Sequence, residues 1–301
     1  MDLRSETHAD RRRAVLSAEV EPSRRMNICD VGASAIGEAP YAGLLRDGLA
    51  HVYGFEPSPE QFTRLQEIKS EQETYFEAAV GAPGKRTLHI HPRPGFTSLF
   101  KMDAASMKAI GKEKLVSDRV EEVELTTVAL DEVEDLPRVD VLKMDLQGGE
   151  LEVLKGAEDR LSEAVAVVSE VRFHRIYEGE PMFGDIDVEL RRQGFRLHKL
   201  LFTKSVMMPH DHEGAVVRKR MTSQLLDGDA VYVREADYSA EFSDDKLLFL
   251  LLAADAMFDS PDFVLHLMEV AVERGLLPKG LWRDYVARLR SHQQAGKEGG
   301  A

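Results

Sequence analysis

Acidic residues stand beside glycines in three short segments, a combination that suits the binding of a polar small molecule. In the first segment Asp30 is followed by a turn with small residues at four positions, Gly32, Ala33, Ser34 and Gly37. A glycine turn after a buried strand lets the backbone approach a ligand closely. Asp30 beside that turn would repel a pyrophosphate but can help to hold a cationic amino-acid group. The turn lacks the dinucleotide fingerprint G-x-G-x-x-G, because Ser34 occupies the place of the second glycine.

The second segment places an acidic residue at the end of another apolar strand pattern. Glu56, followed by Pro57, stands about 20 positions beyond the glycine turn. A carboxylate at this place can accept hydrogen bonds from both hydroxyls of a ribose. NAD-dependent enzymes use such an acid too, so Glu56 alone indicates a ribose without choosing the cofactor. Combined with Asp30, the charges fit the sulfonium and amino-acid groups of S-adenosylmethionine better than they fit NAD.

The third segment brings two carboxyl groups and an amide to the end of a strand. Asp145 follows an apolar run, Gln147 lies two residues on, and Glu150 begins a helical pattern after a glycine pair. Carboxyl groups crowded in one crevice can have raised pKa values, and one of them can then act as a general base. We assign that role to Asp145. Glu150 stays open, because an acid at a helix N-terminus also stabilises the helix by about 0.3–1 kcal/mol without any catalytic role.

Weaker candidates lie on either side of this segment. Glu170 ends a later strand, and His174 follows it closely, so both could orient or deprotonate a hydroxyl group. A single histidine in a loop is more often merely solvated. Ser98 lies in a glycine- and proline-flanked loop that could close over an acceptor. The histidine pairs 89/91 and 210/212 lack a well-spaced third and fourth ligand, so the sequence predicts no metal site.

Short β-rich runs alternate with helical patterns from residue 26, which predicts an α/β fold with a mostly parallel sheet and helices on both faces. Strands are expected over 26–31, 51–55, 75–80, 139–144 and 164–171, and a closing pair over 195–202 and 230–234. Between the third and fourth of these strands lies an excursion with strands near 87–91 and 122–128 and a helix near 104–114. The carboxyl ends of parallel strands meet at one edge, so the three segments should lie together there.

Composition divides the chain into a main domain and less regular ends. We expect an N-terminal, loosely attached arm over 1–25, a Rossmann-like domain over 26–237, a helical extension over 238–292 and a disordered polar tail over 293–301. Apolar residues on the late helices form a stripe, which fits packing on the main domain, a homodimer surface or a lid. These alternatives stay open.

Charge and hydropathy limit the classes of partner. The 301 residues carry a net charge of −14, which disfavours binding to phosphate backbones and hence to nucleic acid. The single cysteine fits a reducing compartment. The apolar run over 247–254 is too short for a bilayer, which needs about 20 residues. These features, and the lack of a signal-like N-terminal segment, predict a soluble, cytoplasmic protein that does not act at membranes.

The three segments together resemble the FkbM family of S-adenosylmethionine-dependent methyltransferases. The run from Leu142 to Ala157 is similar to that family's long signature almost residue for residue. Further similarities lie at Asp30-Val31-Gly32-Ala33, Glu56-Pro57, Ala78-Ala79-Val80-Gly81 and Thr97-Ser98-Leu99, and the resemblance spans about residues 26–200. One departure concerns the glycine loop, where the family usually has Asn at the position of Ser34 and reaches the next glycine one residue sooner.

The resemblance implies a Rossmann-like methyltransferase domain that holds S-adenosylmethionine over Asp30, Gly32 and Glu56, with an acceptor near Asp145 and Glu150. It also implies cofactor contacts at Ala33, Ser34, Gly37, Pro57 and Ala79, and acceptor contacts at Ser98, Gln147 and Glu170. The expected reaction is O-methylation of a hydroxyl on a small molecule or sugar. Two other classes stay open, namely a catalytically silent S-adenosylmethionine-binding scaffold or sensor and, less in keeping with the glycine pattern, a nicotinamide-dependent oxidoreductase.

Overall fold

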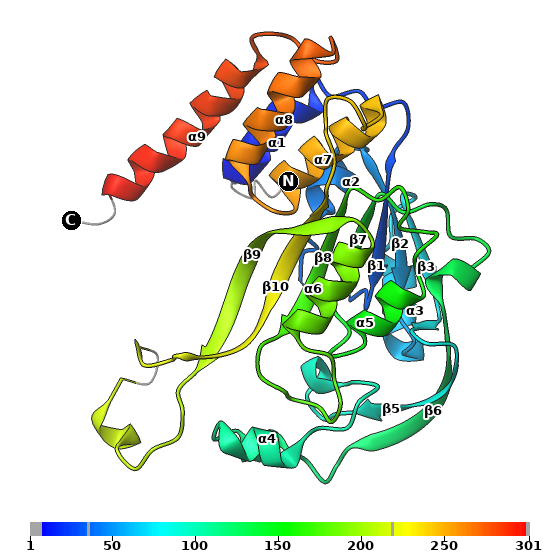
Figure 1. Cartoon of the computed structure of the whole chain (residues 1–301), viewed down its shortest axis with the longest axis vertical. Coiled ribbons are helices and arrows are strands. Elements are labelled where there is room, and N and C mark those ends of the chain that lie inside the picture. Colours follow the sequence, from blue (N-terminus) through cyan, green and yellow to red (C-terminus); the bar gives the residue numbers. More distant parts are fainter. Residues whose placement is uncertain (1–7, 35–36, 218–219, 299–301) are drawn as a thin grey trace.

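A seven-stranded sheet runs through the middle of the chain (Figure 1), in the strand order β3-β2-β1-β7-β8-β10-β9. The computed structural model describes residues 8–34, 37–217 and 220–298. The strands of this sheet are β1 Met26–Val31, β2 Ala50–Phe55, β3 Glu73–Phe76, β7 Val141–Met144, β8 Ala166–Arg172, β9 Phe195–Val206 and β10 Gln224–Arg234. The strands from β3 to β8 are parallel to their neighbours, whereas β10 is antiparallel to both β8 and β9.

The strand order reverses between β1 and β7, and this reversal fixes where a ligand can bind. From β1 the chain builds outward to β2 and β3 on one side, and later strands continue from β7 on the other. In open α/β sheets the crevice outside the carboxyl ends of the strands at such a switch point is the usual binding place. The predicted Rossmann-like α/β fold is therefore confirmed, and the glycine turn after β1 and Asp145 after β7 lie side by side.

Side chains alternate between two cores, one on each face of the sheet. On one face Ile28, Val52 and Val141 pack with α2 (Ala42–Arg46) and α7 (Asp244–Ala256). On the other face Val31 and Leu142 pack with α5 (Glu150–Lys155) and α6 (Phe183–Arg192). Strands buried on both faces in this way carry near-continuous apolar sequences. Helix α3 (Pro59–Ile68) connects β2 to β3 and buries Leu65.

The excursion between β3 and β7 forms a second, three-stranded sheet at the bottom of the view in Figure 1. Its strands are β4 Ala79–Val80, β5 Gly84–Ile90 and β6 Glu121–Val128, and the short helix α4 covers Ala104–Ala109. The single strand expected over residues 75–80 is therefore wrong, because the chain leaves the main sheet after Phe76 and β4 pairs with β6 instead. Four 3-10 turns complete the described elements: Pro94–Phe96, Glu113–Leu115, Leu130–Glu132 and Glu213–Ala215.

The C-terminal helices pack on the main domain together with the N-terminal segment. Helix α7 is followed by α8 (Pro261–Glu273) and α9 (Leu281–Glu298), which lie at the top of Figure 1 beside α1 (His8–Ser17). Ser243 caps the N-terminus of α7, since its hydroxyl accepts a hydrogen bond from the amide of Lys246. Residues of α7 from Leu247 to Asp255 are buried on every side of the helix. Among the described residues, no helix is both long and apolar enough to cross a membrane.

The N-terminal segment is held far more firmly than the sequence predicted. Leu16 of α1 is fully buried, and Arg12 forms an ion pair of 2.5 Å with Asp255 of α7. The hydroxyl of Tyr285 in α9 donates to the same carboxylate at 2.7 Å. This corrects the expectation of a loose attachment for the described part of the arm, because residues far away in the sequence supply its partners. Helix α9 also continues past residue 292, where a polar tail was expected, to Glu298.

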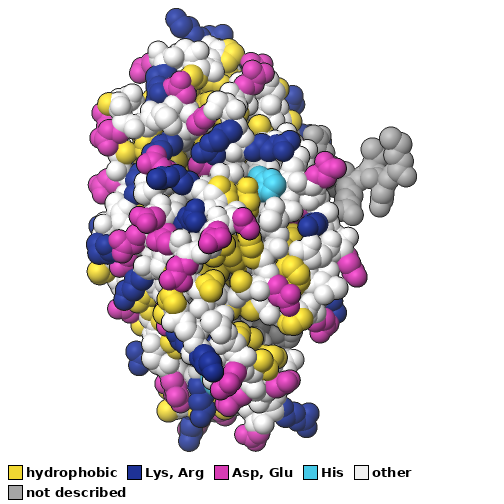
Figure 2. All heavy atoms as spheres, turned by 90° about the vertical axis from the view of Figure 1, so that its right-hand side faces the viewer, with side chains coloured by type: hydrophobic (Ala, Val, Ile, Leu, Met, Phe, Trp, Pro, Cys, Tyr) yellow, Lys and Arg dark blue, Asp and Glu magenta, His cyan; other side chains and the backbone are white. Residues whose placement is uncertain are grey.

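Acidic and basic side chains are interspersed over the face drawn in Figure 2. They surround a band of hydrophobic side chains near the middle of that face. The face carries no continuous basic surface among the residues coloured there.

Candidate active site

The turn after β1 is forced into close contact with the strand end that carries Asp145. Gly32 has a φ of +86°, and a Cβ atom at this position would lie only 2.2 Å from the main-chain oxygen of Asp145. The amides of Gly32 and Ala33 both donate to the carbonyl of Phe55, each at 3.1 Å. Only glycine meets both conditions, a left-handed backbone and a backbone neighbour at that distance. The ends of β1, β2 and β7 are thereby joined at one point.

The remaining residues predicted for the cofactor loop differ in exposure. Ala33 is buried, and its methyl group packs close to Gly54 of β2, so its contribution is to the packing of the turn. Ser34 and Gly37 are exposed. Gly37 also has a positive φ, of +83°, and has open space where a side chain would project. Residues 35–36 between them lie outside the described residues.

Asp30 already has a partner for each of its carboxylate oxygens. The hydroxyl of Tyr41 donates to Oδ2 at 2.6 Å, and Nζ of Lys143 donates to Oδ1 at 2.9 Å. Burial opposes the charge of Lys143, but the charge and hydrogen bond of Asp30, together with the charges of Asp145 and Asp229, outweigh it and raise the pKa of that lysine. The charge of Asp30, expected from the sequence to lie next to the cofactor, is therefore buried and neutralised by Lys143 of β7. Asp30 helps to fix the end of β1 from which the glycine turn begins.

Glu56 keeps one carboxylate oxygen available at the end of β2. Its Oε1 accepts the amide of Ser58 at 2.7 Å, and Oε2 has no hydrogen-bond partner in the part of the chain that the structure describes. Burial raises the pKa of this half-buried carboxyl group. Pro57, also half-buried, follows directly. Glu56 is thus partly shielded from water and held in place by the amide of Ser58. This arrangement suits a carboxylate that accepts hydrogen bonds from hydroxyl groups.

Asp145 and Gln147 form the exposed end of β7. The carboxylate of Asp145 is exposed, and its Oδ1 accepts from Nε2 of Gln147 at 3.1 Å. Gln147 has a φ of +56°, which a residue with a side chain rarely adopts. The strained conformation is held from outside, because Ser98 Oγ donates to the Gln147 carbonyl at 2.6 Å. Strain of this kind that is held in place by neighbours is typical of functional sites.

Glu150 faces the backbone of its own turn. Its carboxylate accepts from the amides of Leu146, at 2.9 Å, and Gly148, at 3.0 Å. Burial raises its pKa to about 7, and the negative charge of Asp145 acts in the same direction. Both oxygens are used to hold the loop that carries Asp145 and Gln147, so Glu150 positions that loop.

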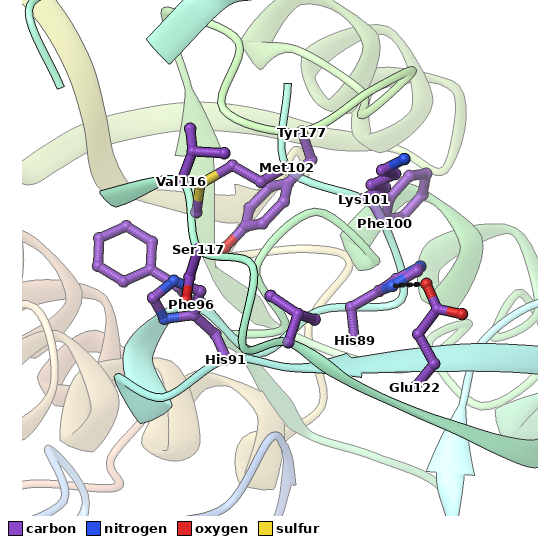
Figure 3. A pocket seen from close by; sticks show the side chains of 11 residues that line it. His89, His91, Phe96, Phe100, Lys101, Met102, Val116, Ser117, Glu122 and Tyr177 are labelled. Atoms are coloured by element: carbon purple, nitrogen blue, oxygen red, sulfur yellow. Dashed lines mark ion pairs between the residues drawn. The ribbon is translucent and has the colours of Figure 1, made fainter. Parts of the chain in front are cut away.

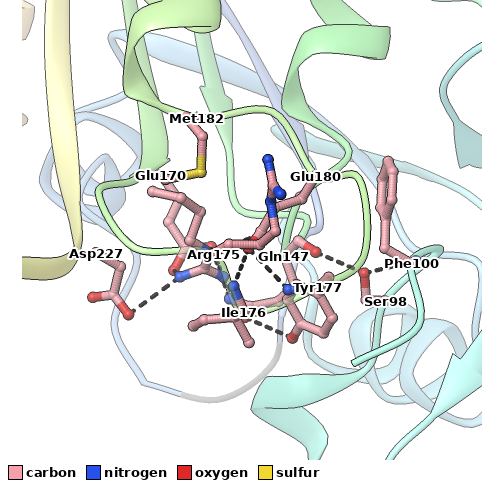
Figure 4. Close-up of polar contacts among 12 residues, drawn as sticks. Ser98, Phe100, Gln147, Glu170, Arg175, Ile176, Tyr177, Glu180, Met182 and Asp227 are labelled. Atoms are coloured by element: carbon pink, nitrogen blue, oxygen red, sulfur yellow. Dashed lines mark hydrogen bonds and ion pairs between the residues drawn. The ribbon is translucent and has the colours of Figure 1, made fainter. Parts of the chain in front are cut away.

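Gln147 contacts a buried group of charged side chains and forms one network with them (Figure 4). We call it the Arg172 cluster; its members are Gln147, Glu170, Arg172, Glu180 and Asp227. The guanidinium of Arg172 donates twice to Glu170, at 2.9 and 3.0 Å, and once to Gln147 Oε1, at 2.7 Å. It also forms ion pairs with Asp227 at 3.2 Å and Glu180 at 3.4 Å. Such a network fixes the amide of Gln147 and, through it, the carboxylate of Asp145.

The cluster leaves some buried polar atoms without a hydrogen bond, namely Arg172 Nε, Glu180 Oε2 and Asp227 Oδ1. Burial raises the pKa of Glu170, and the charges of Asp145 and Glu150 add to the rise. Burial together with the charge of Asp145 likewise raises the pKa of Asp229, which is the register partner of Glu170 on the adjacent strand β10. Acidic groups exceed basic ones in this crevice among the described residues, which favours a ligand with positive charge or with hydroxyl groups.

The other predicted residues lie near the site but have other partners. His174 contacts α4, with Nε2 at 3.0 Å from Ser106 Oγ, and none of its hydrogen bonds joins it to Asp145. Ser98 is buried and holds the Gln147 loop from behind. Ala79 lies in β4, where it pairs with Thr127. No group of three or more His, Cys, Asp or Glu side chains among the described residues could hold a metal ion.

Several residues of the site were not predicted from the sequence. Lys143, Tyr177, Glu180 and Asp227 join it only through the fold. A weak signal was present for Arg172, because Glu170 and Arg172 alternate on one face of β8 and can therefore pair. Asp227 is the register partner of Arg172 across β8 and β10, a relation that no local pattern contains.

Comparison with known proteins gives one family and several remote structural matches. The family model described as "Methyltransferase FkbM domain" matches residues 30–197. No curated protein matches the chain.

Three of the solved structures that it matches are methyltransferases or related proteins. Precorrin-6y C5,15-methyltransferase from Geobacter metallireducens is 12% identical, with a TM-score of 0.34, over 74% of this chain and 87% of that one. Magnesium protoporphyrin IX methyltransferase from Synechocystis, with bound SAM, is 14% identical, with a TM-score of 0.37, over 75% and 78%. TYW2 from M. jannaschii, in complex with AdoMet, is 13% identical, with a TM-score of 0.32, over 77% and 78%.

Proposed function

Because the chain belongs to the FkbM family of methyltransferases, whose methyl donor is S-adenosylmethionine, we propose that it transfers that methyl group to a hydroxyl oxygen of a small molecule or sugar. The single observation that carries this proposal is the contact between Gly32 and the main chain of Asp145. It brings the glycine turn of the cofactor side and an exposed carboxylate of the acceptor side to one edge of the sheet. A transfer between two bound molecules needs such a junction.

The residues on the cofactor side fit S-adenosylmethionine. The available oxygen of Glu56 suits a ribose hydroxyl, and Ser34 and Gly37 of the turn are exposed, with open space where a side chain of residue 37 would project. The surplus of acidic groups at this sheet edge suits a cation. S-adenosylmethionine supplies a methyl group that its sulfonium has already activated. The work left to this chain is to orient the acceptor, exclude water and move a proton.

Asp145 is the residue we assign to that proton. Its carboxylate is exposed at the carboxyl end of β7 and is oriented by the amide of Gln147, which also contacts Glu170, Arg172 and Tyr177. A hydroxyl group placed against Asp145 would give up its proton to the carboxylate while its oxygen takes the methyl group, whose bond to the sulfonium sulfur breaks. General-base assistance of this kind contributes about 10²–10⁴-fold to a rate. Glu150, Ser98 and the Arg172 cluster act as positioning residues, because each holds the loop or the amide next to Asp145.

The proposal is tested by calorimetric titration with S-adenosylmethionine. The wild type should bind it saturably, and Glu56→Ala should weaken binding by at least about tenfold, since a buried hydrogen bond to a carboxylate contributes about 1.5–3 kcal/mol. Glu60→Ala is the matched control, because Glu60 lies in the next helix with its side chain 72% exposed. Absence of saturable binding to the wild type would overturn the proposal.

Methyl transfer itself is followed by incubating the protein with S-adenosylmethionine that carries a labelled methyl group and with host metabolite extracts. Label in a base-stable methyl ether of a small molecule is the expected product. Label on a nitrogen or carbon atom would still show methyltransferase activity but would exclude a hydroxyl group as the acceptor. Binding of the cofactor without product in any extract would favour a silent scaffold or sensor.

A further inference from the structure

A cavity of about 210 Å³ lies between the small sheet and the loop after β8 (Figure 3). We propose that this cavity is the acceptor subsite and that it holds a single aromatic ring whose hydroxyl group is the one methylated. The proposal rests on the proposed function and narrows it from small molecules and sugars in general to phenols. It is carried by the lining of the cavity, by its size and by its connection to the Gln147 loop.

The walls of the cavity are mainly aromatic and apolar. Phe96, Phe100 and Tyr177 contribute rings, and Met102, Val116 and Val120 fill the space between them. Aromatic rings attract another ring in edge-to-face or offset geometry, and a methionine sulfur adds a favourable contact to a ring edge.

His91 belongs to the wall and has no free nitrogen for a ligand. Its Nδ1 accepts the amide of Arg93 at 3.0 Å, and its Nε2 lies 2.9 Å from the carbonyl of Leu115, to which it donates. The ring is in contact with Phe96, at a centroid distance of 5.4 Å and an angle of 61° between the ring planes. His91 therefore adds to the aromatic wall rather than to the polar groups that could bind a ligand.

Besides His91 and Tyr177, the polar side chains of the lining are His89, Lys101, Ser117 and Glu122. Lys101 is exposed, and Glu122, whose side chain is 65% exposed, pairs with His89 at 3.4 Å. Hexose hydroxyls project on all sides and each needs a hydrogen-bond partner when buried. The walls offer too few such partners for a sugar, whereas a phenol has a single hydroxyl to satisfy.

The size of the cavity fits one substituted ring. A dry, apolar protein cavity of about 150 Å³ is enough to bind benzene. The present cavity, of about 210 Å³, has room for a ring with a hydroxyl group and a small second substituent. A fused polycyclic acceptor would have to extend past the rim.

Two of the aromatic walls also touch the loop that carries Asp145. The hydroxyl of Tyr177 donates to Gln147 Oε1 at 3.3 Å, so its ring faces the cavity while its oxygen joins the Arg172 cluster. Phe100 lies so close to Gly148 that a Cβ atom there would be 3.3 Å from its ring. The amide of Phe100 is held by Ser98, which also holds Gln147. A ring in the cavity is thus bounded by the same residues that fix the reaction centre.

The test uses fluorine NMR with two probes, 4-fluorophenol for the proposed class and 2-deoxy-2-fluoroglucose for sugars. Val116→Trp fills the cavity, and Val123→Trp, on an exposed position of β6 outside the cavity, is the matched control. The wild type and the control should bind 4-fluorophenol saturably, and Val116→Trp should weaken binding by about tenfold to a hundredfold, the value of burying one ring. With S-adenosylmethionine present, the 4-fluorophenol signal should convert to that of 4-fluoroanisole. If circular dichroism shows Val116→Trp to be unfolded, Val120→Trp takes its place.

Each outcome separates this inference from the function on which it rests. No saturable binding of 4-fluorophenol, binding that the cavity-filling variant leaves unchanged, or preference for the fluorosugar would overturn the aromatic subsite. Calorimetry with S-adenosylmethionine on the same three proteins should give equal affinities, because none of the changes lies on the cofactor side. If the protein binds S-adenosylmethionine but not the phenol, the aromatic subsite is wrong and the proposed methyltransferase function stands. If it binds the phenol but not S-adenosylmethionine, the proposed function is wrong and the aromatic site stands.

Discussion

The acidic residues of the site separate by environment into different tasks. Asp145 is exposed and, among the described residues, has the Gln147 amide as its one side-chain partner, whereas Glu150 and Glu170 are buried and engaged by amides or by Arg172. A carboxylate that must receive a proton has to reach the acceptor, and among these three Asp145 alone is exposed. The sequence places these acids at one sheet edge without ranking them, because the exposure of each acid depends on what packs above it.

Replacing Asp145 with Asn should abolish most of the turnover without loss of cofactor binding. The amide keeps the size of the side chain and removes the proton acceptor, so kcat should fall by about 10²–10⁴-fold. Labelled-methyl assays on an identified acceptor measure the rate, and calorimetry measures the affinity for S-adenosylmethionine. His174→Gln serves as the comparison, because His174 contacts Ser106 and should leave the rate nearly unchanged. Near-full turnover in Asp145→Asn would mean that Asp145 is not the base.

Glu150 should make the stability of the protein depend on pH. Burial raises the pKa of Glu150 from 4.5 to about 7. Between these values the native state binds more protons than the unfolded state, so the contribution of Glu150 to the free energy of unfolding is fully present below pH 4.5 and is lost as pH rises through about 7. Glu150→Gln cannot titrate and should remove this fall, as urea denaturation at several pH values between 5 and 8 would measure. Glu178→Gln, at an exposed position, should retain it. A fall of equal size in Glu150→Gln would assign the pH dependence to other groups.

At the scale of elements, the turn after β1 determines how the two halves of the site meet. The turn has a positive φ at Gly32 and runs against the end of β7, and the structure shows why no other residue fits there. Sequence reasoning found the turn through its glycine and acidic pattern. It could not find the contact with Asp145, since the two segments are adjacent only because β1 and β7 pair in parallel.

Gly32→Ala should destabilise the protein more than the same change at another glycine with a positive φ. Gly179 has a φ of +72° and nothing within 4 Å of the added methyl group, so Gly179→Ala should cost about 1–2 kcal/mol for the left-handed conformation alone. Gly32→Ala should lose that amount and about 1–3 kcal/mol more for overpacking against the Asp145 main chain. Urea denaturation of both variants measures the difference. Equal losses would contradict the close approach.

The small sheet of β4, β5 and β6 is the other element that matters for function. It was expected as a loose set of strands and a loop, with Ser98 closing over an acceptor. In the structure Ser98 is buried and anchors the Gln147 loop, and it is the neighbouring Phe96 and Phe100 that line the cavity. A serine with glycine and proline neighbours predicts a turn, but whether it faces a ligand or another loop is decided by the segment that packs against it.

At the scale of the whole molecule, the two ends of the described chain close one face of the sheet together. Helix α1 packs on α7 and α9, and its Arg12 pairs with Asp255, which Tyr285 also contacts. The extension therefore belongs to the main core, of which Leu16 and Leu250 are both members.

Removing the charge of Arg12 should test this closure. Arg12→Met keeps the apolar stem of the side chain and leaves Asp255 buried without its cationic partner, which should lower the free energy of unfolding by about 3–5 kcal/mol. Glu269→Ala, at an exposed position on α8, should change it by less than about 0.5 kcal/mol. Thermal or urea denaturation provides the comparison, and the double variant Arg12→Met/Asp255→Asn should recover part of the loss. If Arg12→Met unfolds like Glu269→Ala, the N-terminal segment does not stabilise the core.

The sequence alone indicates most strands of the main sheet, its Rossmann-like character and the three segments at its edge. Each of these depends on residues that are close in the chain: alternation and apolar runs for strands, and glycine beside acid at Gly32 and Asp145. Local preferences of this kind are set by backbone sterics and by periodicity, so they can be read without a fold. The motif that resembles the FkbM signature can likewise be recognised from residues that are close together in the chain.

Only the tertiary structure decided which of these side chains face one another. Lys143 neutralises Asp30 from 113 residues away, Arg172 meets Asp227 from 55 residues away, and Arg12 reaches Asp255 from 243 residues away. The strained backbone of Gln147 and the aromatic cavity likewise arise where separate segments pack together. Strand register and helix docking depend on the sum of many long-range contacts, and no short stretch of sequence contains that sum.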